Sequence, residues 1–433
     1  MAAAALVGRV GGLAAALGVG AGIALAATGV AWADTGSASS GTASSSASKT
    51  STGTGARQKP RTVQAVKSVS KPASAAANQI PKAPNVVALA LSALGATRRD
   101  DETATPSAAT VSVSRATSAR VVPAADAVST PPVDESLYSG PPPTMVQRAV
   151  VAGLRLINFV TTTLHLPSPL AGSSAQIPLF TDGVPPAFLL HGIKAEKTEY
   201  EGMAVWTLTP RDPSGQYVVA IHGGSFIGQV SIFHWLTYTD MARDTGATVV
   251  VPLYTLAPVG NAATDIPVMA DFISAQIAAH GTDNVSVEGD SAGGNIALAA
   301  LQEIVKRGDA QPHRLLLLAP ALDLSDSFDN PVDDPLLGNG RNSQILTWAG
   351  DLDPADPLVS PIYGSLAGLP PTTVYTSSRD LLTQQALRLR DKAITENVDF
   401  TFVLREGQFH DWTIFALPDS YRERPGIYQA LGL

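Results

Sequence analysis

The sequence predicts an α/β fold in which a mostly parallel sheet is covered by helices on both faces. From about residue 198 onward, short apolar and β-branched runs alternate with longer helical patterns, an order typical of a parallel sheet. The chain has 433 residues, enough for one large domain with extensions. No internal repeat suggests a solenoid or a propeller instead.

The strands and helices can be placed by their apolar periodicity. The strand candidates are residues 203–209, 217–221, 247–253, 284–288, 314–319, 372–377 and 400–404, and the helical patterns between them include 265–280, 291–307 and 381–395. Gly308 follows the second of these helices as a stop signal. We therefore expect the folded domain to occupy residues 144–433, with residues 144–197 forming cap helices ahead of the sheet.

Residues 145–165 form the first helical pattern of this domain. Its apolar positions fall on one face, and they are Val146, Val150, Leu154, Ile157, Val160 and Leu164. Arg148 and Arg155 fall on the opposite face, which argues against a transmembrane span. We expect this helix to dock on the domain that follows.

The first 33 residues have the pattern of a secretory signal peptide. Arg9 precedes an apolar run of about twenty residues that ends at Ala31-Trp32-Ala33, which predicts export with cleavage after Ala33. The run is long for a signal peptide, so an uncleaved membrane anchor is the alternative.

Residues 34–143 are rich in Ser, Thr, Ala and Pro and contain a single aromatic, Tyr138. Such a segment cannot bury enough apolar surface to offset the entropy of ordering, so it is predicted to be a disordered linker. Residues 35–99 carry nine Lys and Arg and no Asp or Glu. A solvated linker is the simpler interpretation, and association with an anionic cell envelope is the sharper one.

Charge and cysteine content exclude several classes of function. Residues 1–143 carry 12 Lys and Arg against 7 Asp and Glu, whereas the remaining residues carry 17 against 30. An acidic body argues against a nucleic-acid-binding core. With no cysteine in the chain, disulfides, thiolate metal sites and a cysteine nucleophile are excluded.

The stretch "VSVEGDSAGGNIALAA" (285–300) places a serine between a strand pattern and a helix pattern. A G-x-S-x-G match alone is weak, but the strand–turn–helix context is that of a nucleophile elbow. Gly289 and Gly293 would relieve clashes between strand and helix, and Asp290 lies between strand and serine. A structural turn would favour Asn-Gly or Pro-Gly instead. Ser291 is therefore the candidate nucleophile.

Backbone donors for an oxyanion are predicted in an earlier loop. "YVVAIHGGSFIG" (217–228) places the motif His222-Gly223-Gly224-Ser225 directly after a strand. Small residues there let N–H groups point into a cavity, and Ala292, the residue after the nucleophile, supplies another.

An acid and a base are expected in that order at the ends of later strands. Asp380 follows "TTVYTSSR", and His410 follows "FTFVLREGQF". Asp353 and Asp356 are rival acids in a proline-rich loop, and Asp411 adjoins His410 but is expected to point elsewhere. The other histidines, His234 among them, are interpreted as surface or packing residues.

Together these motifs resemble the hormone-sensitive-lipase-like branch of the α/β-hydrolase fold. The matching blocks are "HGGS" (222–225), "VPLYTLAP" (251–258), "GDSAGG" (289–294), "DPLVSP" (356–361), Asp380 and "GQFHDW" (407–412). The resemblance implies a triad of Ser291, Asp380 and His410, and an N-terminal cap that serves as lid and acyl-pocket wall.

The same resemblance implies an oxyanion hole built from the N–H groups of Gly224, Ser225 and Ala292, with Gly223 shaping the loop. Two positions depart from the family pattern. Ser225 replaces the usual third glycine, and Leu381 replaces the proline after the acid. A positive φ at Ser225 would be strained.

The predicted reaction is hydrolysis of a small-molecule or lipid carboxylic ester through an acyl-enzyme, without a metal or organic cofactor. An amidase or deacetylase with the same triad is one alternative. A catalytically inactive, ligand-binding homologue is the other, although such a binder has no need to keep both Ser291 and His410. The acyl chain length and the alcohol stay open.

Overall fold

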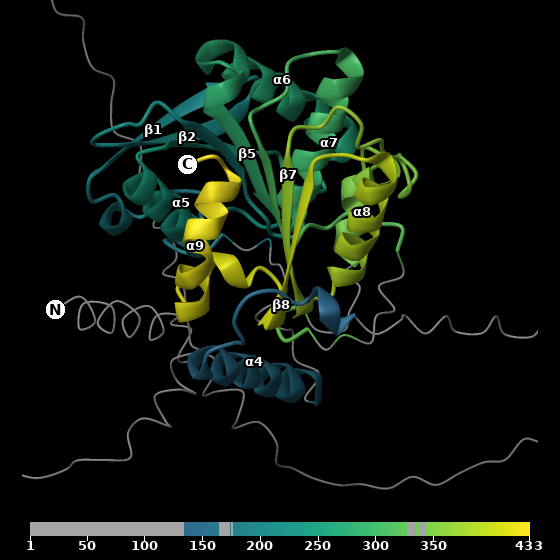
Figure 1. Ribbon diagram of the computed structural model, residues 1–433. Coiled ribbons are helices and arrows are strands. Elements are labelled where there is room, and N and C mark those ends of the chain that lie inside the picture. The colour runs from purple at the N-terminus through teal and green to yellow at the C-terminus, as the bar shows by residue number, and fades with distance from the viewer. Residues whose placement is uncertain (1–133, 164–173, 175, 327–331, 333, 338–342) are drawn as a thin grey trace, which may run out of the picture. The chain divides into compact units, whose positions relative to one another are not determined.

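The core of the structure is an eight-stranded sheet with the order β1-β2-β4-β3-β5-β6-β7-β8 (Figure 1). The structure is a computed structural model that describes residues 134–163, 174, 176–326, 332, 334–337 and 343–433. The strands are β1 (Ile193–Tyr200), β2 (Met203–Pro210), β3 (Tyr217–Ile221), β4 (Thr248–Leu253), β5 (Val285–Asp290), β6 (Leu315–Leu318), β7 (Thr372–Arg379) and β8 (Phe400–Phe409).

The sheet is parallel from β4 to β8, and the pairs β1/β2 and β2/β4 are antiparallel. The seven predicted strands correspond to β2–β8, which confirms the predicted fold class. Strand β1 was not predicted. Its sequence, IKAEKTEY, is mostly exposed, and an edge strand with so little burial leaves only a weak apolar signal.

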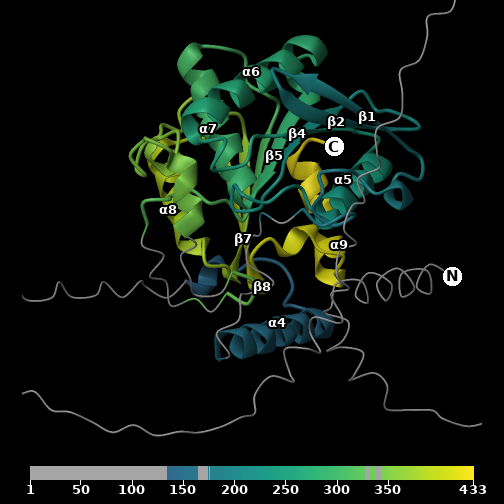
Figure 2. The ribbon, with the colours of Figure 1, turned by 180° about the vertical axis from the view of Figure 1, so that it is seen from behind.

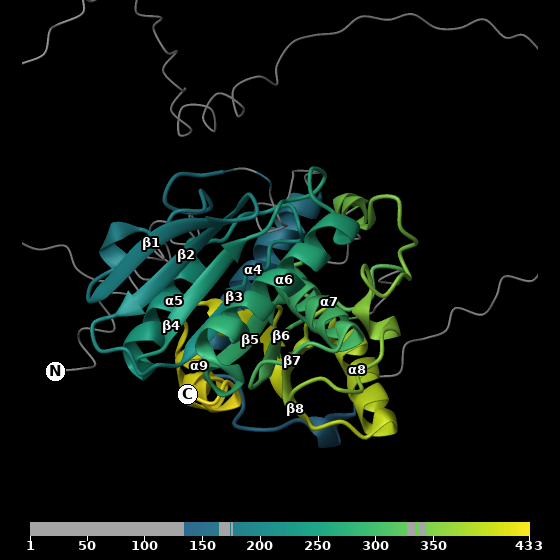
Figure 3. The ribbon, with the colours of Figure 1, turned by 90° about the horizontal axis from the view of Figure 1, so that it is seen from above.

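Helices cover both faces of this sheet, as Figures 1, 2 and 3 show. They are α5 (Ile232–Thr245), α6 (Ala262–His280), α7 (Ser291–Arg307), α8 (Thr383–Glu396) and α9 (Pro418–Ala430). Val219 and Ile221 of β3 lie in the core shared with α6, α7 and α8, whereas Val218 and Ala220 lie in the core shared with α5 and α9. Alternate residues of one strand therefore fill two cores, because side chains alternate across a sheet.

Short 3-10 helices connect these elements, and they are η1 (Glu135–Leu137), η2 (Ala187–Leu189), η3 (Thr282–Asn284), η4 (Ser343–Ala349), η5 (Pro361–Tyr363) and η6 (Trp412–Ile414). Helix ends follow the expected capping chemistry. The side chain of Asn261 accepts a hydrogen bond from the N–H of Thr264 at the start of α6, and Gly308 has a left-handed conformation (φ 76°) at the end of α7.

The N-terminal part of the described chain corrects two expectations. Residues 134–143 were predicted to belong to the disordered linker, but η1 lies there and Tyr138 forms a β-bridge with Leu404 of β8. The bridge supplies backbone partners that composition does not reveal. The predicted signal peptide and the rest of the linker, up to residue 133, lie outside the described residues. The predicted cap region, 144–197, contains one α-helix and η2 among its described residues, and its end forms part of β1.

Helix α4 (Met145–Thr163) lies across the end of the sheet at which β8 finishes (Figures 1 and 2). Its inner face matches the predicted one in part. Val151 and Leu154 are buried against Phe409 and Trp412, whereas Val146, from the predicted apolar face, is 47 % exposed. Leu154 and the half-buried Val150 belong to the predicted face, whereas Val151 does not, because apolar residues occupy more than one side of this helix. None of the described helices is long and apolar enough to cross a membrane.

Candidate active site

Ser291 lies at a sharp turn between β5 and α7. Strand β5 ends at Asp290 and α7 begins at Ser291, whose φ of 49° is in the left-handed region that a serine rarely adopts. A Cβ on Gly289 would overlap the carbonyl of Gly293, and a Cβ on Gly293 would overlap the carbonyl of Ile221. The two glycines therefore let strand, turn and helix approach closely, which holds the strained serine in place.

Three of the predicted residues form one hydrogen-bonded chain. Ser291 Oγ lies 2.9 Å from His410 Nε2, and His410 Nδ1 lies 2.9 Å from Asp380 Oδ1. Each of the three directly follows a strand, respectively β5, β8 and β7. Because these strands are parallel, their carboxyl ends meet at one edge of the sheet. Ser291 and His410, which are 119 positions apart in the sequence, are thus brought into contact, and so are Asp380 and His410, which are 30 positions apart.

Asp380 is fully buried, and the rival acids lie elsewhere. Its Oδ1 also accepts a hydrogen bond from the N–H of Leu382. Asp353 and Asp356 instead accept hydrogen bonds from backbone N–H groups two residues further along their own loop. Of the three acids weighed against Asp380, only Asp411 contacts His410.

The loop after β3 faces the serine turn with a strained backbone. Gly224, Ser225 and Phe226 all have positive φ, at 122°, 55° and 63°. Ser225 therefore adopts the conformation that the sequence predicted would be strained. The N–H of Gly223 donates to Asp290 Oδ2 at 3.0 Å, so Gly223 fixes the loop. Ala292 lies in the first turn of α7, where backbone donors lack partners within the helix.

Comparison with known proteins places this arrangement in a family. Residues 218–414 match the family model described as alpha/beta hydrolase fold. An esterase of Acinetobacter venetianus is 30 % identical over 234 residues, which are 52 % of this chain and 74 % of that protein. The chain belongs to the α/β-hydrolase fold family. The resemblance predicted from its motifs is thereby confirmed.

Further relatives of this α/β-hydrolase carry related names. A triacylglycerol lipase of Mycobacterium tuberculosis is 48 % identical over 267 residues, 61 % of this chain, and the match spans 57 % of that protein's length. Among solved structures, a putative esterase from Staphylococcus aureus has a TM-score of 0.54 at 25 % identity, covering 58 % of this chain and 87 % of that one. An esterase from the bacterial hormone-sensitive lipase family has a TM-score of 0.55 at 23 % identity, covering 67 % and 98 %, and it shows the shared fold.

Asp411 does not point away from the site of this α/β-hydrolase, as the sequence analysis expected. Its Oδ2 lies 3.1 Å from His410 Nε2, the atom that also contacts Ser291 Oγ. Asp411 has a φ of 51°, and this left-handed turn directs its side chain back toward the preceding histidine. The expectation was wrong, because neighbouring side chains diverge in an extended strand but not at this left-handed turn.

His234 was interpreted as a surface or packing residue, and the structure corrects this. It is buried in α5, and its Nε2 lies 3.0 Å from Asp290 Oδ2, the oxygen that accepts the N–H of Gly223. The N–H of Ser231 donates to His234 Nδ1, so Nε2 carries the proton and donates to Asp290. His234 therefore holds Asp290, the residue that fixes the loop after β3. Its place twelve residues after His222, at the start of a helix, was the only sequence signal.

His222 is a structural member of the same loop. Burial, followed by the charge of His234, lowers the pKa of His222 to about 4, so its imidazole is neutral near pH 7. Its Nδ1 donates to the carbonyl of Gly223 at 2.7 Å, and its ring stacks on Tyr254. A neutral His222 adds rigidity to the loop without adding charge.

Asp334 lies beside the triad and was missed by the sequence analysis. Side-chain atoms of Asp334, Asp380 and His410 lie within 4.8 Å of one another, close enough to consider a metal ion. Asp334 Oδ2 accepts the N–H of Leu381, and Asp380 Oδ1 accepts from His410. These hydrogen bonds explain why the three side chains lie together, because they support the arrangement of Ser291, His410 and Asp380.

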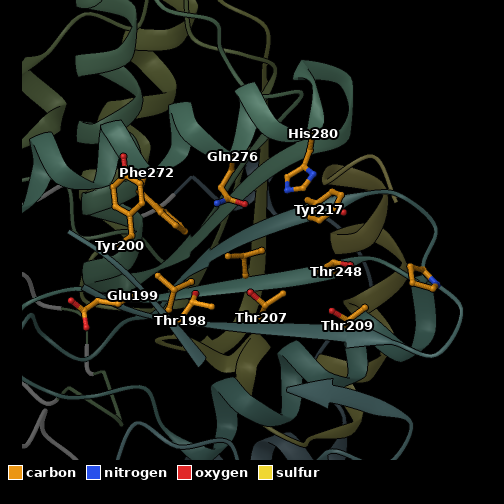
Figure 4. Close-up of a pocket in the computed structure, with 13 residues that line it drawn as sticks. Thr198, Glu199, Tyr200, Thr207, Thr209, Tyr217, Thr248, Phe272, Gln276 and His280 are labelled. Atoms are coloured by element: carbon orange, nitrogen blue, oxygen red, sulfur yellow. The ribbon is translucent and has the colours of Figure 1, made fainter. Parts of the chain in front are cut away.

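A cavity of about 410 Å³ lies between α6 and the face of β1, β2, β3 and β4 (Figure 4). Its lining includes Tyr217 and Thr248, the first residues of β3 and β4, and His280 at the end of α6. Parallel strands begin at the edge opposite the one that carries Ser291. This cavity is therefore separate from the triad.

Proposed function

We propose that this protein hydrolyses carboxylic esters through a covalent acyl-enzyme on Ser291. The observation that carries the proposal is the continuous chain from Ser291 Oγ through His410 to Asp380 at the carboxyl edge of the sheet. A serine activated in this way attacks carbonyl carbon. The names of the relatives, esterase and triacylglycerol lipase, support the same chemistry.

In the first half of the reaction, His410 Nε2 takes the proton of Ser291 as Oγ attacks the ester carbonyl. Negative charge then develops on the carbonyl oxygen, which the N–H groups of Gly224, Ser225 and Ala292 stabilise. His410 next gives its proton to the leaving alcohol as the C–O bond breaks. Asp380 keeps Nδ1 protonated and stabilises the imidazolium.

In the second half, a water molecule replaces the alcohol. His410 takes a proton from this water, whose oxygen attacks the acyl carbon, and the same N–H groups hold the second oxyanion. Collapse breaks the bond to Ser291 Oγ, which recovers its proton from His410 and releases the acid. Every step uses groups of the chain and water.

Lipid esters are the substrate class that we propose. The 48 % identical relative is named a triacylglycerol lipase, and the outer face of α4 is unusually apolar. Its exposed side chains include Met145, Val146, Leu156, Phe159 and Val160. The inner face of the same helix packs on Phe409 and Trp412, the neighbours of His410 and Asp411. An apolar surface beside the site suits the approach of an ester with a long acyl chain.

The test is turnover of p-nitrophenyl esters with acyl chains from two to sixteen carbons. The wild-type protein should hydrolyse them, and Ser291→Ala should reduce kcat on the order of 10⁶-fold. Higher kcat/KM for chains of eight carbons or more supports lipid esters, whereas a maximum at two to four carbons contradicts that substrate class. Equal turnover by wild type and Ser291→Ala contradicts ester hydrolysis by this site, and cleavage of matched anilides but not esters would favour the amidase alternative.

We further propose that residues 1–33 direct export and that the basic segment 35–99 associates with the cell envelope. The apolar run ending at Ala33 supports the first proposal, and nine cationic side chains without an acidic one support the second. N-terminal sequencing should find the chain starting at Asp34, and an intact Met1 would contradict cleavage. Salt of about 0.5 M should release the protein from isolated envelopes because it screens exposed charges, whereas retention in salt contradicts an electrostatic tether.

A further inference from the structure

His410 Nε2 has two oxygen neighbours rather than one. Ser291 Oγ lies at 2.9 Å, and Asp411 Oδ2 lies at 3.1 Å. A general base accepts a proton through the lone pair on this nitrogen. A carboxylate oxygen at this distance from Nε2 stabilises the protonated imidazole relative to the neutral one, because opposite charges attract. The position of Asp411 therefore favours a proton on Nε2 in addition to the one on Nδ1.

The fold keeps Asp411 in this position. It directly precedes η6, its left-handed φ is 51°, and its carbonyl accepts the N–H of Ile414. The side chain is buried, and its Oδ1 accepts no hydrogen bond from the part of the chain that the structure describes. The carboxyl group is therefore held against the imidazole without a competing partner.

We propose that Asp411 is a positioning residue that holds a proton on Nε2 of His410. While this proton is bound, His410 cannot accept the proton of Ser291, and it becomes a base only when the proton passes to solvent. The inference rests on the proposed ester hydrolysis by Ser291. At low pH this proton occupies the lone pair that Ser291 needs. As pH rises the proton leaves to water, and His410 becomes able to deprotonate Ser291.

Three carboxyl groups, those of Asp290, Asp380 and Asp411 itself, share this cluster with the imidazoles of His234 and His410. The titratable groups that act on it from the packed elements are Asp290 at the end of β5, Asp380 after β7, His234 and Tyr238 on α5, and His410 itself. Helix α9 also packs on this region, but Asp419 pairs with Arg422 and Glu423 pairs with Arg405. Helix α4 adds Arg148, which is exposed, and Arg155. This excess of carboxyl groups favours keeping a proton in the cluster.

Both partners have shifted pKa values in the direction that this arrangement requires. Burial, opposed by the charge of His410 and reinforced by Asp290 and Asp380, raises the pKa of Asp411 to about 7. Burial alone would lower the pKa of His410, but the charges of Asp411 and then Asp380 outweigh it and hold that pKa well above the ordinary value. The two groups titrate as a pair.

The experiment is the pH profile of kcat/KM on a soluble p-nitrophenyl ester for wild type, Asp411→Asn and Asp411→Gly. Asn and Gly both tolerate the left-handed backbone. Removing the negative charge destabilises the imidazolium, so the base form should appear at lower pH. We expect the midpoint of the acid limb to fall by about one pH unit, so that at pH 6 each variant keeps roughly tenfold more of its plateau activity than wild type.

The matched control is Asp283→Asn, which removes an exposed carboxyl group just before the start of β5, at the opposite edge of the sheet. Its acid limb should coincide with that of wild type.

Acid limbs of Asp411→Asn and Asp411→Gly that coincide with wild type overturn the proposal. So does complete loss of turnover in a variant with native circular dichroism, because the triad should work without Asp411. If one variant does not fold, the other decides. Loss of turnover in Ser291→Ala tests the underlying hydrolysis separately.

Discussion

Two buried carboxyl groups lie beside His410 on its Nδ1 side, and they have different partners. Asp380 accepts the hydrogen bond from the imidazole, whereas Asp334 accepts backbone N–H groups of Leu336, Leu337 and Leu381. Burial, followed by the charge of Asp380, raises the pKa of Asp334 to about 6. At the scale of single residues, Asp380 therefore orients the imidazole of His410, and Asp334 orients the loop that carries Asp380.

Paired substitutions separate these two tasks. Asp380→Asn should lower kcat about 10⁴-fold, because an amide neither fixes the required tautomer nor stabilises the imidazolium. Asp334→Asn should lower kcat less than about tenfold, since its amide oxygen can still accept the backbone N–H groups. Steady-state kinetics on one p-nitrophenyl ester measures both, with circular dichroism as the control for folding. Equal losses would contradict the assignment of Asp380 as the acid.

At the scale of elements, α4 is apolar on two faces that meet different surroundings. Leu154 is 6 % exposed and packs in the cluster that contains Phe409 and Trp412, whereas Leu156 is 62 % exposed. Burial of one face anchors the helix over the carboxyl edge of the sheet. The other face can contribute to substrate approach without contributing to stability.

Two identical substitutions on this helix should therefore have different effects. Leu154→Ala should lower the free energy of unfolding by about 2 kcal/mol or more, because it removes buried contacts and leaves a cavity. Leu156→Ala should change it by less than about 0.5 kcal/mol. Denaturant unfolding followed by circular dichroism compares them. A larger loss for Leu156→Ala would show that the exposed face is covered in solution.

At the scale of the whole molecule, the acidic body gathers buried carboxyl groups near the carboxyl edge of its sheet. They are Glu288, Asp290, Asp334, Asp380 and Asp411. Burial, followed by the charge of Asp290, raises the pKa of Glu288 to about 8. Its Oε2 has no hydrogen-bond partner among the described residues. Such a group is neutral in the folded chain near pH 7 and ionised in the unfolded chain.

This difference makes global stability fall as pH rises. The contribution of Glu288 is fully present below its unfolded pKa, near 4.5, and is lost as pH rises through about 8. Glu288→Gln should therefore weaken the fall in unfolding free energy between pH 5 and pH 9, with an effect on the order of a few kcal/mol at most. Urea unfolding at several pH values measures it. An unchanged pH dependence would show that Glu288 is ionised in the folded protein.

The sequence by itself determined the fold class and the candidate triad. The strand–turn–helix pattern around Ser291 is a local signal, and so is the order of Asp380 and His410 after later strands. Because these strands are parallel, the three residues at their carboxyl ends lie close together. Seven of the eight strands could be predicted because each carries a clear apolar run. Steric needs at Gly289 and Gly293 are equally local, because they follow from one turn.

Only the tertiary structure decided which further side chains meet the triad. His234 and Asp334 lie on segments without a motif, and they approach Asp290 and Asp380 through helix and loop packing. Asp411 contacts His410 because of a single left-handed backbone angle. The buried face of α4 was decided in the same way, by the position of Phe409 and Trp412. Contacts of this kind depend on how elements pack in three dimensions, and a periodic pattern along one chain does not record them.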